Sequence, residues 1–390
     1  MEKKNNPDTS QNSIIYANNA ATSWPKPPSV LAAVSQAAAG PYLEQGRTTL
    51  QDVPDYLFET RRKLANFFNT RDPDAYVFTA NATDSLNLLI HGFAAQEKEP
   101  FHVITTSFEH NSVIRPLYEL QKTGRISVTV IPPNSNGVID PDDVSGAIRD
   151  DTKLGIISHA GNVTGTVQNI KEISRIMDEA DTFSIIDGAQ SAGQIPVDLS
   201  TTSCDAFVFT GHKYLFGVPG TGGFFLRSPD QIYPVRQGGT GTDSSSPVQP
   251  ESMPERFEAG TPNFPGIAGL AAGIAFVQDI GIESIQKKSM GMISDLIQQL
   301  HNIKGVSLLH ENPQTPLVSF QIPGLDPNDI GYILAKAFRI ISRSGLHCAP
   351  WIHSRLTEGK GAVRISLSYM NTPEECAQIA DAINALCQSV

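Results

Sequence analysis

Between Phe101 and Leu226 this chain alternates short apolar, β-rich runs with amphipathic stretches, and no other feature limits its fold so strongly. Amphipathic stretches such as Ile170–Glu179 separate several of the apolar runs. The alternation predicts an α/β domain with a mostly parallel central sheet covered by helices, and ligands of such sheets gather where the strands end. Buried strands are predicted at Phe101–Thr106, Val128–Ile131, Leu154–Ser158, Phe183–Ile186, Ala206–Thr210 and Gly222–Leu226.

A different pattern begins after about Gly281 and predicts a smaller α+β domain. Since 390 residues are long for one domain, we expect a large domain over 14–280 and a small domain over 281–390. Residues 1–13 are polar and predict a flexible tail, and the residues just after it are expected to pack with the small domain. The Gly-, Thr- and Ser-rich segment Gly238–Pro250 predicts a surface loop. The small domain is predicted to contain helices at Ile282–Leu300 and Pro373–Leu386 and strands near Val306–Leu309 and Leu317–Ile322.

Composition argues against several classes of function. The net charge is −11 and no basic cluster stands out, which argues against a nucleic-acid binder. No apolar run reaches about 18 residues, so no membrane span is predicted. The first dozen residues lack the apolar segment of a signal peptide. The four cysteines show no CxxC pair and no zinc spacing, so we expect no metal site and a cytoplasmic protein with reduced thiols.

Polar side chains follow two of the predicted strands, at the edge where ligands are expected. Asp187 ends one strand, and its buried carboxylate needs a partner such as a protonated ring nitrogen, although a helix cap or an ion pair would serve equally. Lys213 directly follows another strand, where desolvation lowers the pKa of an amine and makes it a nucleophile. Thr210 and His212 lie in the same turn and can donate hydrogen bonds to a phosphate.

Two further segments complete this arrangement. Thr79–Asp84 precedes a helical pattern, and a helix N-terminus binds phosphate, although an ordinary capped helix gives the same signal. His110 follows a strand and can stack on a ring or transfer a proton, although a lone histidine is more often structural. Each signal is moderate alone. Together they provide a lysine for a covalent link, a carboxylate, a stacking group and a phosphate site, and this set predicts that Lys213 carries pyridoxal 5′-phosphate (PLP).

Eight longer motifs span nearly the whole chain. They are Tyr16–Thr22, Thr79–Asp84, Glu109–Ser112, Asn162–Thr166, Asp187–Gln190, Thr210–Lys213, Phe257–Asn263 and Arg343–Pro350. In this order they resemble the class V aminotransferases of PLP fold type I and, within them, the cysteine desulfurases. The resemblance implies that family's fold, a large PLP-binding domain with a smaller α+β domain, and a homodimer.

The resemblance also implies roles for individual residues. Lys213 matches the lysine that carries the cofactor, Asp187 the partner of the pyridine nitrogen and Gln190 the partner of the ring hydroxyl. His110 matches the stacking residue and is expected to act in catalysis. Thr261 matches a residue that reaches the phosphate in the neighbouring subunit, which implies composite active sites. Further cofactor contacts fall on Ala82, Thr83, Thr210 and His212, and substrate contacts on Asn19, Ala20, Asn162, Arg343 and Arg364. Asn162 and Arg364 match the binders of the substrate carboxylate, a task that suits the bidentate fork of arginine.

The chain departs from the family pattern at three places. Asn18 stands where the family usually has Asp, and Gly161 stands where Ser is common. The segment Gln45–Asp55 matches the usual Gly- and Arg-rich stretch only loosely. These departures concern the substrate pocket more than the cofactor.

Cys348 decides which reaction is expected. A free cysteine is usually a small buried hydrophobe, and we expect Cys204, Cys376 and Cys387 to be structural. Cys348 instead falls in a predicted loop near Arg343, and cationic neighbours favour the thiolate form. It matches the nucleophile of the cysteine desulfurases. The resemblance therefore implies conversion of L-cysteine to L-alanine, with sulfur carried as a persulfide on Cys348 to a thiol or an acceptor protein.

Other activities fit the same scaffold. A cysteine or cystine C–S β-lyase would release pyruvate and ammonia without using Cys348 as a nucleophile. A selenocysteine lyase would prefer the selenium substrate. An aminotransferase or epimerase would act on a specialised substrate. A catalytically inactive scaffold would only bind a sulfur-acceptor partner, but the presence of Lys213, Asp187 and His212 argues against it.

Overall fold

The structure of the protein is a computed structural model that describes residues 14–42, 55–242 and 244–388. The tail predicted at 1–13 lies outside the described residues, and so does the loosely matching segment Gln45–Asp55 apart from Asp55 itself. The described part of Gly238–Pro250 contains no helix or strand and most of it is exposed.

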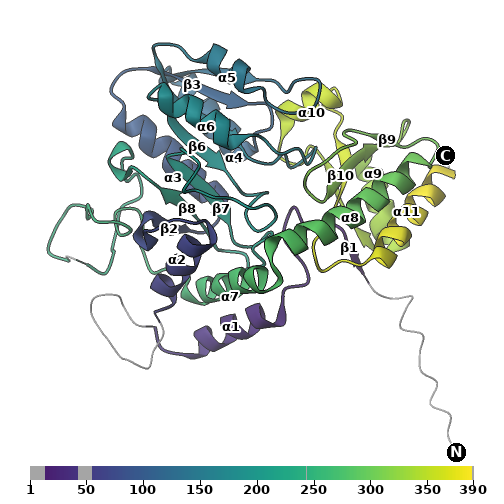
Figure 1. The fold of residues 1–390 in the computed structure, drawn as a ribbon, viewed down its shortest axis with the longest axis horizontal. Helices are drawn as coiled ribbons and strands as arrows, with labels where there is room; N and C mark the ends of the chain where they lie inside the picture. The colour runs from purple at the N-terminus through teal and green to yellow at the C-terminus, as the bar shows by residue number, and fades with distance from the viewer. Residues whose placement is uncertain (1–13, 43–54, 243, 389–390) are drawn as a thin grey trace, which may run out of the picture.

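A seven-stranded sheet forms the centre of the large domain, in the order β2-β8-β7-β6-β5-β3-β4 (Figure 1). The strands are β2 Tyr76–Thr79, β3 Phe101–Thr106, β4 Ile126–Ile131, β5 Thr152–Ser158, β6 Phe183–Asp187, β7 Ala206–Thr210 and β8 Gly222–Leu226. The neighbours from β4 through β7 pair in parallel, and β8 runs antiparallel to both β7 and β2. The prediction of an α/β fold with a mostly parallel sheet is confirmed. The sequence had indicated every strand of this sheet except β2, whose four residues are too short a run to stand out.

Helices cover both faces of the sheet. They are α1 Pro28–Ala39, α2 Tyr56–Phe67, α3 Ala82–Gln96, α4 Asn111–Lys122, α5 Pro141–Ala147, α6 Ile170–Glu179 and α7 Phe264–Ile280, with short 3₁₀ turns at Pro73–Ala75 and Pro229–Gln231. Because adjacent residues of a strand point to opposite faces, Phe207 and Phe209 of β7 join a core with α2, α6 and α7, whereas Ala206 and Val208 join a core with α3 and α4.

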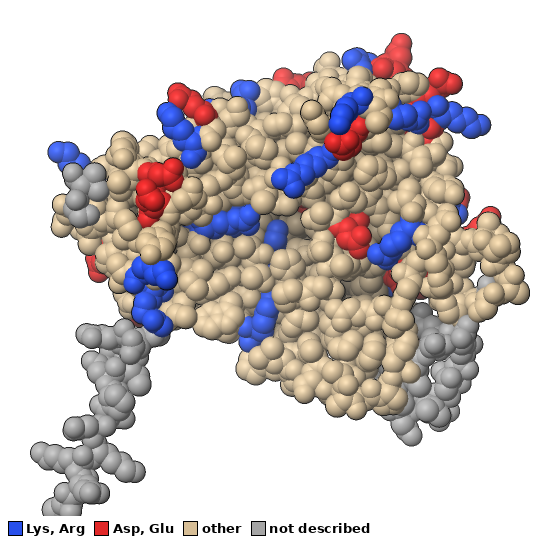
Figure 2. Space-filling view, turned by 180° about the vertical axis from the view of Figure 1, so that it is seen from behind, with Lys and Arg blue, Asp and Glu red and all other residues tan. Residues whose placement is uncertain are grey.

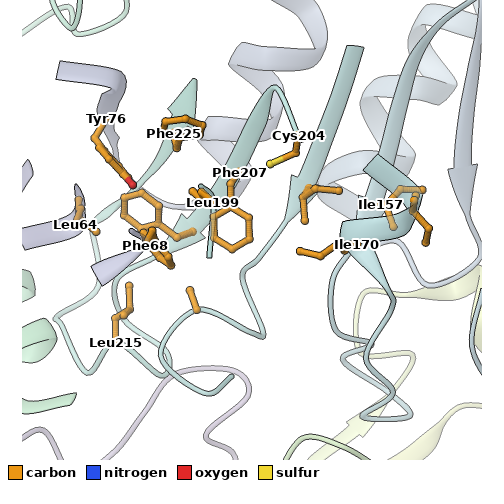
Figure 3. Close-up of a cluster of buried hydrophobic side chains, with 14 of the residues drawn as sticks. Leu64, Phe68, Tyr76, Ile157, Ile170, Leu199, Cys204, Phe207, Leu215 and Phe225 are labelled. Carbon is orange, nitrogen blue, oxygen red and sulfur yellow. The ribbon is translucent and has the colours of Figure 1, made fainter. Parts of the chain in front are cut away.

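The first of these cores is rich in aromatic side chains (Figure 3). Phe68 lies at its centre, with its ring centroid 5.2 Å from that of Phe207. Burial of each such side chain contributes about 1.5–3 kcal/mol. This packing holds the strands of the large domain in place, and with them the polar residues at their ends.

The small domain follows α7 along the chain. Its elements are α8 Ile282–His301, β9 Ser307–Leu308, β10 Leu317–Gln321, α9 Pro327–Phe338, β11 Ile340–Ile341, β12 Arg343–Gly345, α10 Pro350–Leu356, β13 Ala362–Ser366 and α11 Pro373–Gln388. An antiparallel sheet in the order β12-β13-β10-β9 forms its centre. The short strand β1 (Ile15–Tyr16), from the other end of the chain, pairs in parallel with β11.

Gly281 separates α7 from α8, which meet at an angle of 80°. Its φ of 85° lies in the left-handed region that favours glycine, so the sharp bend occurs where a side chain would be strained. In the described part of the chain, no single helix is long and apolar enough to cross a membrane, and only this bent pair reaches that length and composition together. On the face shown in Figure 2, the basic and acidic side chains of the described residues are interspersed.

Candidate active site

A cavity of about 430 Å³ lies where the strand ends of the large domain face β12 and β13 of the small domain. Most of the site residues predicted from the sequence line it. These are Ala20, Ala82, Thr83, His110, Asn162, Asp187, Gln190, Thr210, His212, Lys213, Arg343 and Arg364. The rule that ligands of an α/β sheet gather at the strand ends therefore locates the cavity correctly.

Asp187 and Lys213 lie on neighbouring strand ends and perturb each other. Asp187 is the last residue of β6, and burial raises the pKa of its carboxyl, which accepts a hydrogen bond from the backbone N–H of Ala189 at 2.9 Å. No ion pair engages this carboxyl within the described residues, so a protonated ring nitrogen would give it a partner. Desolvation lowers the pKa of Lys213 to about 8, and the negative charge of Asp187 opposes the shift. The amine is thus close to its neutral, nucleophilic form near neutral pH.

Several polar atoms on the cavity wall have no partner among the described residues. Oγ1 of Thr210, Nδ1 of His212 and Oε1 of Gln190 are buried and unpaired. Ala82 and Thr83 are the first residues of α3, whose N-cap Asn81 accepts a hydrogen bond from the N–H of Asp84 at 3.0 Å. Unpaired polar atoms beside a helix N-terminus suit a phosphate, and the same wall has partners for a pyridine ring. The residues present therefore fit PLP.

Glu109 and His110 follow β3, and of the two only His110 lines the cavity. His110 caps α4, because its Nδ1 accepts a hydrogen bond from the N–H of Ser112 at 3.1 Å. Burial, reinforced by the charge of Lys213, lowers the pKa of His110 to about 4 and keeps the ring neutral. Glu109 is fully buried and accepts hydrogen bonds from Oγ1 of Thr106 (2.7 Å) and from the N–H and Oγ of Ser158 (3.0 and 2.8 Å). Burial raises the pKa of this carboxyl to about 7.

Arg364 of β13 is completely buried without a carboxylate partner among the described residues. Its Nη1 donates to the carbonyl of Asn162 at 2.8 Å, its Nη2 donates to Oδ1 of Asn18 at 3.4 Å, and its Nε has no partner. Burial and the neighbouring charge of Arg343 lower its pKa to about 10. A buried guanidinium that has no carboxylate partner is suited to bind an anionic ligand.

Cys348 lies beside the cavity and is not one of the residues that line it. It is half-buried, and its Sγ accepts a hydrogen bond from Nη2 of Arg343 at 3.1 Å. Because Arg343 also lines the cavity, the Cys348 thiol contacts a residue that borders the space where a substrate would lie. The other cysteines, Cys204, Cys376 and Cys387, lie in the cores or against them, and burial raises the pKa of each thiol.

Two residues of the predicted set lie elsewhere. Asn19 is fully buried outside the cavity, where its amide donates to the carbonyl of Ser366 and to Oδ1 of Asn371, both at 3.1 Å. Through these bonds, Asn19 connects the N-terminal segment to the small domain, and its role as a substrate contact stays a prediction. Thr261 is exposed in the irregular segment before α7, where it lines two other hollows and not this cavity.

Some residues of the cavity were not singled out from the sequence. Phe108, Ser112 and Ser158 line it, and Glu109 lies behind it. Ser158 is the last residue of β5 and Glu109 comes shortly after β3, whereas Phe108 is apolar and Ser112 lies in α4. The signal that could have found Ser158 and Glu109 is the one that pointed to Asp187 and Lys213, namely a polar residue at or just after the end of a buried strand.

Comparisons with known proteins agree with this arrangement. The sequence model of the class V aminotransferase family matches residues 15–379. A probable cysteine desulfurase of Methanothermobacter thermautotrophicus is 35% identical over 339 residues, which cover 85% of this chain and 83% of that protein. One from Pyrococcus abyssi is 31% identical and covers 97% of this chain and 95% of its own.

The solved apo structure of a cysteine desulfurase from Thermococcus onnurineus NA1 is 29% identical, covers 97% of this chain and 95% of its own, and superposes with a TM-score of 0.89. The likeness thus extends over both domains. This chain therefore belongs to the class V aminotransferase family and groups there with the cysteine desulfurases.

Proposed function

We propose that this protein is a PLP-dependent cysteine desulfurase that converts L-cysteine to L-alanine and carries the sulfur on Cys348. Relatives that match most of the chain at 31–35% identity are named probable cysteine desulfurases, which supports the substrate. The observation that carries the proposal is the 3.1 Å contact between Sγ of Cys348 and Nη2 of Arg343, because Arg343 lines the same cavity as Lys213.

The cofactor would be held by residues that already lack partners. Thr210, His212 and the start of α3 would bind the phosphate, Asp187 would pair with the ring nitrogen, and Gln190 would bond the ring hydroxyl. Lys213 would make the covalent link. PLP, when bound, supplies an electron sink for the α-carbon of an amino acid.

Lys213 and His110 would handle protons beside the α-carbon. With its pKa lowered to about 8, Nζ of Lys213 is neutral in about one molecule in ten at pH 7 and can accept a proton in that form. His110 is neutral at that pH, so its ring can lie against an aromatic ring without adding a positive charge.

Arg364 and Asn162 would bind the substrate carboxylate. The guanidinium of Arg364 is buried and unpaired with any acid in the described chain. The side-chain nitrogen of Asn162 donates to the carbonyl of His347 at 2.8 Å, and its second N–H is left for the substrate. The carboxylate would thus stand between the two domains.

Cys348 would take the sulfur. Its thiolate attacks the substrate sulfur, an S–S bond forms and the Cβ–S bond breaks. The electron pair of that bond stays with Cβ, which takes up a proton, so alanine is released and the sulfur remains as a Cys348 persulfide. A thiol or an acceptor protein would then remove it. Arg343 stabilises the thiolate from 3.1 Å.

Further parts of the proposal concern the assembly and the compartment. Thr261 is exposed and does not line the cavity of its own chain, which supports a homodimer in which it reaches the phosphate site of the partner subunit. A cytoplasmic location agrees with four cysteines that are all free.

The test is to incubate the purified protein with L-cysteine and a reductant and to quantify alanine, pyruvate and sulfide together. We expect alanine and sulfide in equal amounts, and Cys348→Ala should lower both by at least about 100-fold. Cys387→Ala, which removes another half-buried free thiol, is the matched control and should retain the wild-type rate. Wild-type alanine formation by Cys348→Ala would contradict the proposal.

One observation favours a cysteine C–S β-lyase as the second candidate. Cys348 does not line the cavity, and a β-lyase would not need it there. Such an enzyme would form pyruvate and ammonia, and Cys348→Ala would leave that rate unchanged. The ratio of alanine to pyruvate therefore separates the two functions.

A further inference from the structure

Two buried histidines lie directly behind Cys348, and the proposed reaction uses neither. His347 precedes Cys348, and His353 lies in α10, five residues after it. They are 2% and 0% exposed, respectively. Nδ1 of His347 is 2.9 Å from Nε2 of His353, and the two rings lie 5.1 Å apart between centroids. A direct bond between two imidazoles needs one donor and one acceptor, so it has a direction.

The surroundings determine that direction. Nε2 of His347 lies 3.2 Å from the carbonyl of Arg343, which can only accept, so this nitrogen carries the proton. Burial, reinforced by the charge of Arg364, lowers the pKa of His347 to about 2 and that of His353 to about 4, so both rings are neutral. Nδ1 of His347 is then an acceptor, and Nε2 of His353 must donate to it.

The far side of His353 lies next to Thr357. Nδ1 of His353 then carries no proton and is 3.3 Å from Oγ1 of Thr357. That hydroxyl accepts from the N–H of Gly361 at 3.1 Å and donates its hydrogen to the carbonyl of His353 at 2.8 Å. The charged groups that face the two rings are Arg343 of β12 and Arg364 of β13, both cationic, so they favour the neutral rings.

The same bonds govern the contact made by the thiol. The ring of His347 binds the carbonyl of Arg343, and the side chain of Arg343 in turn meets Sγ of Cys348. His347 and Cys348 have φ values of 52° and 59°, in the left-handed region that non-glycine residues seldom adopt. Such a turn persists only when its surroundings hold it.

The backbone of the turn is held from the large domain. The carbonyl of His347 accepts from Nδ2 of Asn162 at 2.8 Å, and the carbonyl of Cys348 accepts from the N–H of Asn111 at 2.7 Å. These bonds attach the peptide units and do not involve the imidazole of His347. That ring is held at Nε2 by the carbonyl of Arg343 and at Nδ1 by His353.

We propose that His353 is a positioning residue for the proposed nucleophile: by donating to His347, it holds the Cys348 turn in the conformation in which the thiol meets Arg343. The inference rests on the proposed function, because Cys348 matters only if it carries the sulfur. Leu at position 353 would fill the space without donating, whereas Gln can place a donor where Nε2 of His353 stands.

The test compares His353→Leu and His353→Gln with the wild-type holoenzyme by the rate at which iodoacetamide alkylates Cys348 at a fixed pH, measured by peptide mass spectrometry. Cys387 in the same molecules is the internal reference. The rate for Cys348 relative to that for Cys387 reports how the turn holds the Cys348 thiol. This readout needs no turnover.

We expect His353→Leu to change the alkylation rate of Cys348 by about threefold or more, because the turn no longer holds the sulfur against Arg343, and to leave that of Cys387 unchanged. The kcat for alanine formation should fall roughly tenfold, with KM within about twofold. His353→Gln should restore most of both. A wild-type alkylation rate and kcat in His353→Leu would overturn the proposal, and so would a His353→Gln variant as impaired as His353→Leu.

A second measurement covers the case in which His353→Leu does not fold, as judged by thermal melting and cofactor absorbance. Long-range ¹H–¹⁵N spectra of histidine-labelled wild-type protein should show His347 and His353 as neutral rings protonated at Nε2. An imidazolium or an Nδ1–H form at pH 7 would overturn the proposal. If instead Cys348→Ala still makes alanine at the wild-type rate, the proposed nucleophile fails, while the alkylation rates still decide the role of His353.

Discussion

Lys213 stands three residues beyond β7 of a buried sheet, whereas Cys348 stands in a turn between β12 and α10 with a φ of 59°. The lysine side of the cavity is carried by strand ends that two apolar cores hold in place. The cysteine side is carried by a few hydrogen bonds from both domains. The difference teaches that one chain can build the cofactor half of a site by packing and the nucleophile half by polar contacts. Substitutions on the first side should remove chemistry without moving the backbone, and substitutions on the second should alter geometry.

The largest effect should come from Lys213→Ala. Without the amine, both the covalent link and the proton acceptor are lost, so alanine formation should fall by roughly 10³-fold or more. Lys26→Gln is the matched control, because burial also lowers the pKa of Lys26 to about 8, while its Nζ only donates to Oγ of Ser23 and the carbonyl of His212, both at 2.8 Å. Rates from alanine assays, with far-UV circular dichroism as a check of folding, make the comparison. Equal losses in the two variants would contradict the assignment.

Two arginine substitutions should separate the two sides of the cavity. Arg364→Lys replaces a bidentate fork with a point charge, so KM for cysteine should rise about 10- to 100-fold. Arg343→Lys keeps the charge near Sγ of Cys348 but loses its fixed orientation, so kcat should fall about tenfold with little change in KM. Steady-state kinetics on cysteine provide both constants. If both variants changed only KM, the two sides would not differ as described.

A smaller effect concerns how the free energy of unfolding depends on pH. It tests the lysine side of the cavity, which is carried by strand ends. The pKa of Glu109 is raised from 4.5 to about 7 by burial, so the folded protein binds an extra proton between these values. The stability that protonated Glu109 contributes is therefore fully present below pH 4.5 and is lost as the pH rises through about 7.

Glu109→Gln cannot ionise and can keep the bonds to Thr106 and Ser158, so it should lack this dependence. As the pH rises from 4.5 to 7, the free energy of unfolding of the wild type should therefore fall by up to about 3 kcal/mol relative to that of Glu109→Gln. Thermal melting across that range measures the difference, and the exposed Glu251→Gln serves as control. Parallel pH profiles of Glu109→Gln and the wild type would show that the buried carboxyl stays ionised.

The residues foreseen from the sequence and the residues missed fall on different sides of this comparison. Asp187, His110 and Lys213 were found because the end of a buried strand is a local feature, and the strand ends of a parallel sheet meet at one edge. Glu109 lies at such an end as well, but its bonds to Ser158 depend on how β3 and β5 are placed side by side. Asn19 is predicted to contact the substrate because it belongs to a motif, but the motif did not indicate that its amide donates to the carbonyl of Ser366.

By itself, the sequence determined the α/β class and the polar residues at the strand ends. Apolar periodicity and the position of a residue after a strand are properties of a few neighbouring residues, so they can be recognised without knowledge of distant contacts. Only the tertiary structure decided that Arg343 meets Cys348, that Arg364 is buried without an acid, and that His353 bonds His347. These contacts depend on how β12, β13 and α10 are packed together and against the large domain, and a hydrogen bond forms only when that packing brings donor and acceptor within about 3 Å.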